Sequence, residues 1–334
     1  MKTWDTISSI HSRSSHSTAK GGKKTLTPEE KKLQEFREKY PHLLQKNDGL
    51  LLFHVFLCIF LYLGLAVTAA LVPQLWVKIL IGPCIAFCGY ALGHASVHHH
   101  TCHKNCADSY LSKKILDFIY TVLELEFVFD GGYNQRRFRR AHLHHHSQPL
   151  VPEDVEHLYV MKQWEKASKS TWTRILYFLD LAFIGAREDV VSLEYINENP
   201  SYKWNMKDYE QAMKEEYKHN VRRSAIMWSI CALLLQVAPA VVWGFLYPMI
   251  LGKNVFSVLG RFQHFDESLL DPKLSKHAKT LSIPCPTWLN YLSCGEITSH
   301  YVHHLFPDMP YYHLWRAHLE IIKDPEMEKM FVFH

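Results

Sequence analysis

The sequence predicts an all-α integral membrane protein, with about four transmembrane helices in two hairpins and a cytoplasmic helical cap that contains the histidine clusters. Three observations lead to this fold class. The apolar residues, 48% of the chain, are gathered into long blocks. These blocks are long enough to cross a bilayer as helices. Histidine is unusually abundant, with 23 in 334 residues, and it clusters next to the ends of the apolar blocks.

The N-terminal segment 1–48 is polar and basic, with ten Lys or Arg residues. No apolar core follows within its first 30 residues, so it is not expected to be a secretory signal peptide. We predict a cytoplasmic segment that is disordered up to about residue 25. From Thr27 onward the pattern predicts a capped, charged helix with Pro28 in its first turn.

Two apolar runs, at about residues 50–72 and 75–93, predict the first transmembrane hairpin. His54 interrupts the first run, and Lys78, near the start of the second, can extend toward the lipid headgroups. The basic residues ahead of the first span place both outer ends of the hairpin in the cytoplasm.

A second hairpin is predicted at about residues 224–238 and 241–262, because the apolar run there is too long for one span. Pro239 marks the break between the two halves. An even number of crossings returns the chain to the cytoplasmic side. The predicted domains are therefore the N-terminal segment 1–48 and a membrane domain 49–334.

Two apolar segments between the hairpins are unsuited to spanning a membrane. The segment 113–133 contains several carboxylates, so we expect a helix that lies in the interface or packs on the cytoplasmic domain. The segment 175–186 has only the length of an interfacial or re-entrant helix.

The histidines form three clusters next to the predicted cytoplasmic ends of the spans. The second and third clusters share the spacing H-x-x-H-H, which places three imidazoles on one face of a helix. The first cluster offers several alternative pairs, and His264 adds a ring where the last span ends. The candidate ligands are His94, His98, His99, His103, His142, His145, His146, His264, His300, His303 and His304. A single such triplet could be a chance feature of a surface helix, but two copies of one spacing favour a metal site.

One metal ion cannot use the nine imidazoles that remain when a single pair is taken from the first cluster. Two ions with four or five ligands each can, and imidazole suits iron, copper and zinc. Cys102 and Cys106 are not expected to form a zinc site, because no second pair accompanies them. The eight cysteines are too scattered for a disulfide framework. A net charge of +4 gives no indication of a nucleic-acid partner.

These residues resemble the membrane fatty acid desaturase family, whose members are integral-membrane di-iron desaturases and hydroxylases with three histidine boxes. The most specific match is His300-Tyr301-Val302-His303-His304-Leu305-Phe306-Pro307, with Pro310-Tyr311 beyond it, which is similar to the family signature HVxHHLFP…P.Y. The resemblance covers roughly residues 50–320, and some features resemble the animal branch called fatty acid desaturase 6. The chain departs from the family in the extra histidines of its first box and in Thr298, where many members have Asn.

The resemblance implies an O2-dependent oxidoreductase of fatty acid biosynthesis that contains two iron ions and has no catalytic residues beyond the metal ligands. It implies a membrane lipid or an acyl-CoA as substrate, with Arg136, Arg139 and Arg140 either binding an anionic headgroup or anchoring the chain at the lipid surface. The chain has no His-Pro-Gly-Gly heme motif, so we expect an external electron donor of the cytochrome b5 or ferredoxin type. The expected location is the endoplasmic reticulum membrane, with the catalytic face toward the cytoplasm.

Three alternatives remain open from the sequence. A hydroxylase or ketolase of a lipid, sterol or carotenoid would use the same metal centre, and only the placement of the substrate carbon separates it from a desaturase. A membrane protein for metal binding or transport would have histidines within its spans, but here only His54 lies in one. An enzyme-like scaffold without activity would account for the irregular first box.

Overall fold

The computed structural model of the protein describes residues 26–128, 142–143, 145–146, 169–183, 218, 221–222, 225–226, 228–248, 251, 280–295 and 297–332. The regular elements within these residues are helices, as the sequence predicts. The chain divides into two compact units, one that ends at Lys39 and one that begins at Tyr40.

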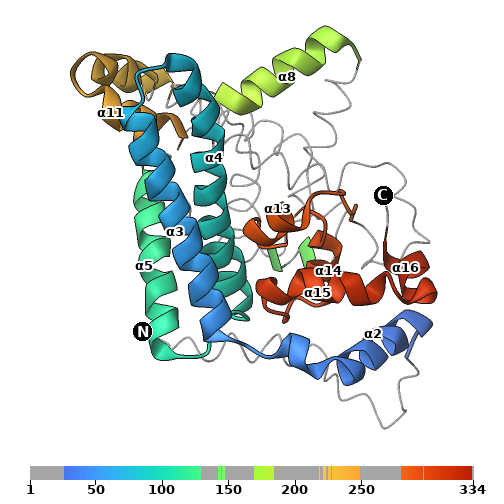
Figure 1. The fold of residues 1–334 in the computed structure, drawn as a ribbon. Coiled ribbons are helices and arrows are strands. Elements are labelled where there is room, and N and C mark those ends of the chain that lie inside the picture. The colour runs from blue at the N-terminus through green and yellow to red at the C-terminus, as the bar shows by residue number, and fades with distance from the viewer. Residues whose placement is uncertain are drawn as a thin grey trace, which may run out of the picture. The chain divides into compact units, whose positions relative to one another are not determined.

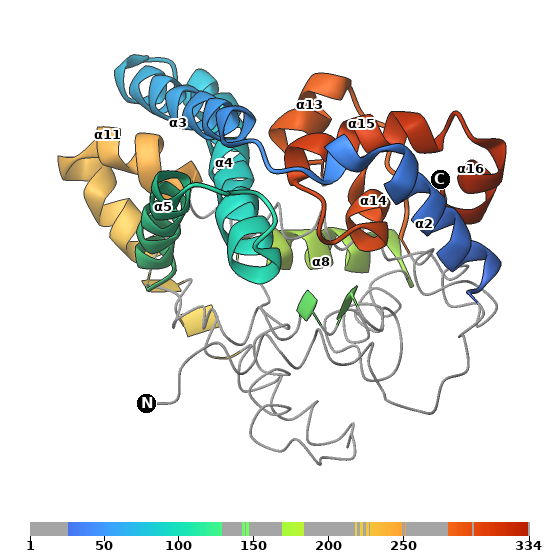
Figure 2. The same cartoon turned by 90° about the horizontal axis from the view of Figure 1, so that it is seen from below.

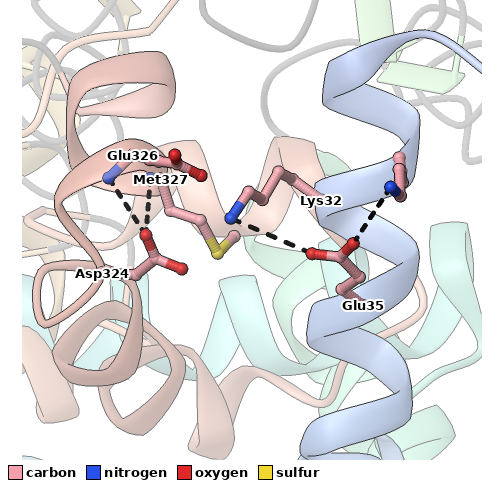
Figure 3. A network of polar contacts seen from close by, with 6 residues as sticks. Lys32, Glu35, Asp324, Glu326 and Met327 are labelled. Carbon is pink, nitrogen blue, oxygen red and sulfur yellow. Dashed lines mark hydrogen bonds and ion pairs between the residues drawn. The ribbon is translucent and has the colours of Figure 1, made fainter.

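Helix α2, Pro28–Lys39, belongs to the first unit and begins with a reciprocal cap. The backbone N–H of Glu30 donates to Oγ1 of Thr27 at 3.1 Å, and the N–H of Thr27 donates to the Glu30 carboxylate at 2.9 Å. Farther along the helix, Lys32 forms an ion pair with Glu35 (Figure 3). The predicted capped, charged helix is confirmed.

The second unit begins with a hairpin of two apolar helices, α3 (Asp48–Leu71) and α4 (Leu75–Gly93), which lie side by side (Figure 1). By length and composition, both helices can cross a membrane. Only 28% of the apolar stretch of α3, and 39% of that of α4, is buried inside the protein. Large side chains such as Phe60 and Leu71 are more than 70% exposed. In a core helix of a soluble protein, such side chains would be buried. The bounds of the first predicted hairpin agree with these two helices.

A broken helical segment packs against the end of this hairpin where α3 passes into α4. The helix Trp228–Val237 stops at Ala238, which has φ −145° and ψ 59°, and Pro239 starts α11 (Pro239–Val241). A short π-helix, η3 (Val242–Leu246), continues from it. The interruption lies where the sequence predicts the break between the third and fourth spans. Only parts of these spans belong to the described residues, so both remain predictions.

Contact between η3 and α3 depends on a glycine. A side chain at Gly244 would place its Cβ 3.2 Å from the backbone oxygen of Ala66, closer than most such contacts. Trp243 packs beside Gly244 on a buried cluster formed by Ala66, Ala69 and Ile85. The broken segment is thereby held against the apolar hairpin.

Helix α5, Tyr110–Val128, packs beside α3 and α4, as both overall views show (Figures 1 and 2). The two residues before α5 are tied to the start of α3, because the carboxylate of Asp48 accepts the backbone N–H groups of Asp108 and Ser109 at 2.9 and 2.8 Å. Within the segment predicted at 113–133, the described residues 113–128 are helical and belong to α5, which lies against the apolar hairpin. Helix α8, Thr171–Phe183, has 13 residues, which agrees with the prediction of a helix too short to span.

The C-terminal part of the second unit gathers short helices around α15, Tyr311–Ile321. Seen from below, this group stands beside the hairpin (Figure 2). The final helix begins at Asp324, whose carboxylate accepts the backbone N–H groups of Glu326 and Met327 (Figure 3). The short helices are η1 (Pro41–Leu44), α13 (Thr287–Leu292), α14 (His300–Leu305) and α16 (Pro325–Phe331).

The turn between α13 and α14 fixes the start of the third histidine box. Cys294 and Gly295 both adopt left-handed backbone conformations there, with φ of 59° and 81°. The buried side chain of Asn290 spans the turn by accepting the N–H of Thr298 and donating to the hydroxyl of Ser299, both at 2.9 Å. Helix α14 therefore starts from a rigid, buried support.

Candidate metal centre

The first histidine box forms a π-helix, η2 (His94–His103), which continues directly from α4. Its wider i→i+5 hydrogen bonding changes which side chains share a face, and π-helical turns are frequent at functional sites. The helix ends at Lys104, which has a left-handed φ of 55°. The residue spacing of the first box did not predict this geometry.

Four histidines from all three boxes converge and are called here the four-histidine group: His103, His142, His146 and His303. One potential ligand atom from each lies within 4.8 Å of those of the other three. Nε2 of His146 is 3.0 Å from that of His303 and 3.1 Å from that of His142. Nε2 of His103 is 3.1 Å from that of His142. The convergence joins segments from opposite halves of the chain.

A second set, called here the three-histidine group, consists of His145, His300 and His304. Nε2 of His304 is 3.1 Å from that of His300 and 3.3 Å from that of His145. The two groups adjoin, because the ring centroids of His146 and His304 are 4.3 Å apart.

The second and third boxes divide between these groups in a reciprocal pattern. In the second box, His142 (position i) and His146 (i+4) belong to the four-histidine group, and His145 (i+3) belongs to the three-histidine group. In the third box, the assignment is reversed. At 100° per residue, position i+4 lies about 40° from position i, whereas i+3 lies about 60° away on the opposite side. One H-x-x-H-H box can therefore supply two ligands to one centre and one ligand to its neighbour.

The distances within the groups suit a transition metal. With metal–nitrogen bonds of about 2.1 Å, neighbouring ligand atoms are separated by roughly 3.0 Å in octahedral and 3.4 Å in tetrahedral geometry. A neutral imidazole has one ring nitrogen without hydrogen, so its lone pair is available to a cation. Burial and the neighbouring imidazoles, His304 and His142 first among them, hold the pKa of His146 well below its usual range. The neutral, ligating form of that ring is thus favoured.

Within the first box, the structure distinguishes the candidates. His103 belongs to the four-histidine group. His99 is buried beside it, with its ring centroid 4.8 Å from that of His303. His100 instead binds α5, through a 3.0 Å contact between its Nε2 and the carboxylate of Asp117. The side chains of His94 and His98 lie outside the described residues, as do His264, Arg136, Arg139 and Arg140.

Asn105, a buried residue two positions after the first box, was not among the predicted site residues. Its side-chain amide donates to the carbonyl oxygens of Pro307 and Met309 at 2.9 and 2.8 Å, and its nitrogen lies 3.4 Å from Nδ1 of His99. Asn105 therefore ties the end of the first box to the loop that follows the third. Only its closeness to the box in sequence could have pointed to this role.

Taken together, the fold and the site define a helical protein whose described residues include two membrane-type helices and a polyhistidine cluster that can hold metal. The model of the family named fatty acid desaturase matches residues 73–334, most of the chain, and the protein belongs to this family. Comparison with individual curated proteins gave no match. Membership in the family makes the protein an oxidoreductase of lipid metabolism with a desaturase or oxygenase type of activity. The family and the two apolar helices are consistent with a membrane protein.

Proposed function

We propose that the protein is a fatty acyl desaturase that uses a di-iron centre, O2 and two electrons to introduce a C=C double bond. The observation that supports this most directly is the convergence of four imidazoles from three separate boxes beside a further group of three. The family supports the oxidative chemistry. A chance cluster on one helix would not explain why ring nitrogens from different boxes lie as close together as the ligands of one metal ion.

In this proposal each histidine group binds one iron. The four-histidine group would hold the first through His103, His142, His146 and His303, and the three-histidine group the second. His94, His98, His99 and His264 are the candidates for further ligands. When bound, the irons supply O2 activation and the removal of hydrogen from an unactivated C–H bond.

The chain itself positions the histidine ligands and excludes water from the site. His303 and His304 are almost completely buried, and the apolar residues around them, Val302 and Phe306, are equally enclosed. Such enclosure strengthens binding of a cation to neutral imidazoles and keeps solvent from the reacting carbon. The acyl chain would approach from the apolar hairpin side, with Arg136, Arg139 and Arg140 near the headgroup of a membrane lipid or acyl-CoA.

The proposal includes a four-span topology in the endoplasmic reticulum membrane and an external electron donor of the cytochrome b5 or ferredoxin type. The packing of η3 on α3 supports the topology, because that contact lies at the end of the hairpin remote from η2. Two hairpins with their tips on one side would leave all three boxes on the other.

The deciding experiment is lipid profiling of cells that express the chain, compared with cells that express His304→Ala. New double bonds that depend on His304 would support a desaturase. New hydroxyl or keto groups would indicate the hydroxylase or ketolase alternative. Unchanged lipids together with metal accumulation would indicate a metal-binding or transport protein.

A further inference from the structure

His54 is a buried histidine inside the first predicted span, and the proposed metal centre gives it no role. Its Nε2 faces the carbonyl oxygen of Leu292 at 3.4 Å. Sγ of Cys58 lies 3.6 Å from the same nitrogen. In the tautomer that donates to the carbonyl, Nε2 carries the hydrogen and Nδ1 has the lone pair. The phenol oxygen of Tyr311 lies 2.8 Å from that Nδ1. In that tautomer the O–H of Tyr311 donates to Nδ1 of a neutral imidazole.

Tyr311 connects this imidazole to the four-histidine group. Its ring centroid is 5.2 Å from that of His99, and the ring of His99 is 4.8 Å from that of His303. The phenol thus stands one imidazole ring away from the group. Tyr311 is 2% exposed, so solvent does not reach it.

We propose that Tyr311 and His54 form a redox pair that consumes single oxidising equivalents produced at the histidine centre. The inference rests on the proposed function, which supplies an O2-derived oxidant and a one-electron donor. Tyr311 transfers one electron to that oxidant, and its O–H bond breaks as the proton forms an N–H bond at Nδ1 of His54. The products are a neutral phenoxyl radical and an imidazolium. The electron donor later returns one electron to the phenoxyl oxygen, and His54 returns the proton.

The geometry meets the chemical requirements of this step. An oxidised phenol is a far stronger acid than a phenol, so a neutral imidazole in hydrogen-bond contact accepts its proton readily. Without that base, a positive charge would remain on a buried ring that solvent does not reach, which is costly. An oxidant formed while no acyl chain is in place would otherwise attack the imidazole ligands. Tyr311, one imidazole ring away, offers an electron source that is more easily oxidised than an imidazole and that can be restored.

A second tyrosine–histidine pair provides a matched control. The phenol oxygen of Tyr301 is 2.8 Å from Nδ1 of His318, and Tyr301 is as buried as Tyr311. The described ring contact of Tyr301 is with His318, not with a histidine of the boxes. Both pairs have a short tyrosine–histidine contact, but the ring of Tyr301, which belongs to α14 itself, contacts His318, whereas the ring of Tyr311 contacts His99.

The test uses the full-length, iron-loaded and reduced protein in detergent, mixed with O2 in the absence of lipid and frozen for electron paramagnetic resonance. A narrow organic radical signal is expected, and its hyperfine splitting should change when the tyrosine rings are deuterated. Tyr311→Phe should abolish the signal. Tyr301→Phe should retain it, and its iron content is measured first because Tyr301 lies between His300 and His303. His54→Gln keeps an acceptor for the phenol but removes the base, so the radical should form more slowly.

The outcomes separate this inference from the proposed function. Iron that binds and is oxidised by O2 without any tyrosine radical, or a radical that persists in Tyr311→Phe, would overturn the redox pair alone. A protein that binds no iron would overturn the proposed function, and metal analysis reveals this beforehand. If Tyr311→Phe fails to retain iron, the His54→Gln variant provides the test. A rate of radical formation in His54→Gln that equals the rate in the unmodified protein would disprove the role of the pair.

Discussion

Nε2 of His146 lies 3.0 Å from Nε2 of His303, although 157 residues separate the two histidines in the chain. No local sequence preference can produce this contact, because it requires the second and third boxes to face each other. Its distance is that of two ligands on one metal ion. Loss of either ring should therefore disturb the same ion.

His303→Ala should abolish product formation and lower the iron content, because it removes a nitrogen that lies 3.0 Å from His146 and 3.5 Å from His142. Iron can be measured by elemental analysis of the purified protein, and product by lipid profiling. His100→Gln is the matched control, since His100 belongs to the first box but binds Asp117 on α5. Equal losses in both variants would contradict the assignment of His303.

The two histidine groups should bind separate irons. His304→Ala breaks the three-histidine group and should reduce the iron content from about two per chain toward one, because the four-histidine group keeps its own ligands. His103→Ala should do the same through the other group. Mössbauer spectra of the two variants should show that different sites remain. A protein that binds only one iron, or only zinc or copper, would contradict the two-site arrangement.

Asn105→Ala should destabilise the protein. The variant leaves the buried carbonyls of Pro307 and Met309 without their donor, at a cost of about 1–3 kcal/mol. The readout is the thermal unfolding midpoint in detergent, together with iron content. Thr68→Ala, which removes an exposed side-chain bond to the carbonyl of Gly64, should change little. A stable Asn105→Ala variant with full iron content would show that the first and third boxes are joined by other contacts.

Gly295→Ala should lower stability more than any glycine change on the surface of α3. Gly295 has φ 81°, which costs a residue with a Cβ roughly 1–2 kcal/mol. The added Cβ would also lie 2.9 Å from the side chain of Leu314 on α15. Gly64→Ala is the control, because nothing lies within 4 Å of the corresponding position. Comparison of the two unfolding midpoints checks the prediction.

Phe60→Lys should weaken insertion of α3 into a membrane. Phe60 is 73% exposed near the middle of this apolar helix, and a lysine at the centre of a span costs about 2.5–3.5 kcal/mol on insertion scales. The fraction of protein that resists alkaline extraction from membranes measures the effect. Phe60→Leu should remain in the membrane fraction, and equal behaviour of both variants would argue against a lipid-facing position.

Several features could be predicted from the sequence because they depend on neighbouring residues. Composition and length determine the two apolar helices, and the predicted bounds agree with α3 and α4 within a few residues. A helix break at a proline is equally local, so the interruption before Pro239 was predictable. The H-x-x-H-H spacing also indicates that the second and third boxes each present a set of imidazoles at adjacent helical positions.

Only the tertiary structure decided how these sets combine. The spacing predicts His300, His303 and His304 as one unit. In the packed structure, His303 belongs to the four-histidine group, and the other two histidines belong to the three-histidine group. Packing also decided that His103 joins the second box while His100 turns to Asp117. The reason is physical: spacing along a helix defines the direction of each side chain, but the partner in that direction is set by how distant segments pack.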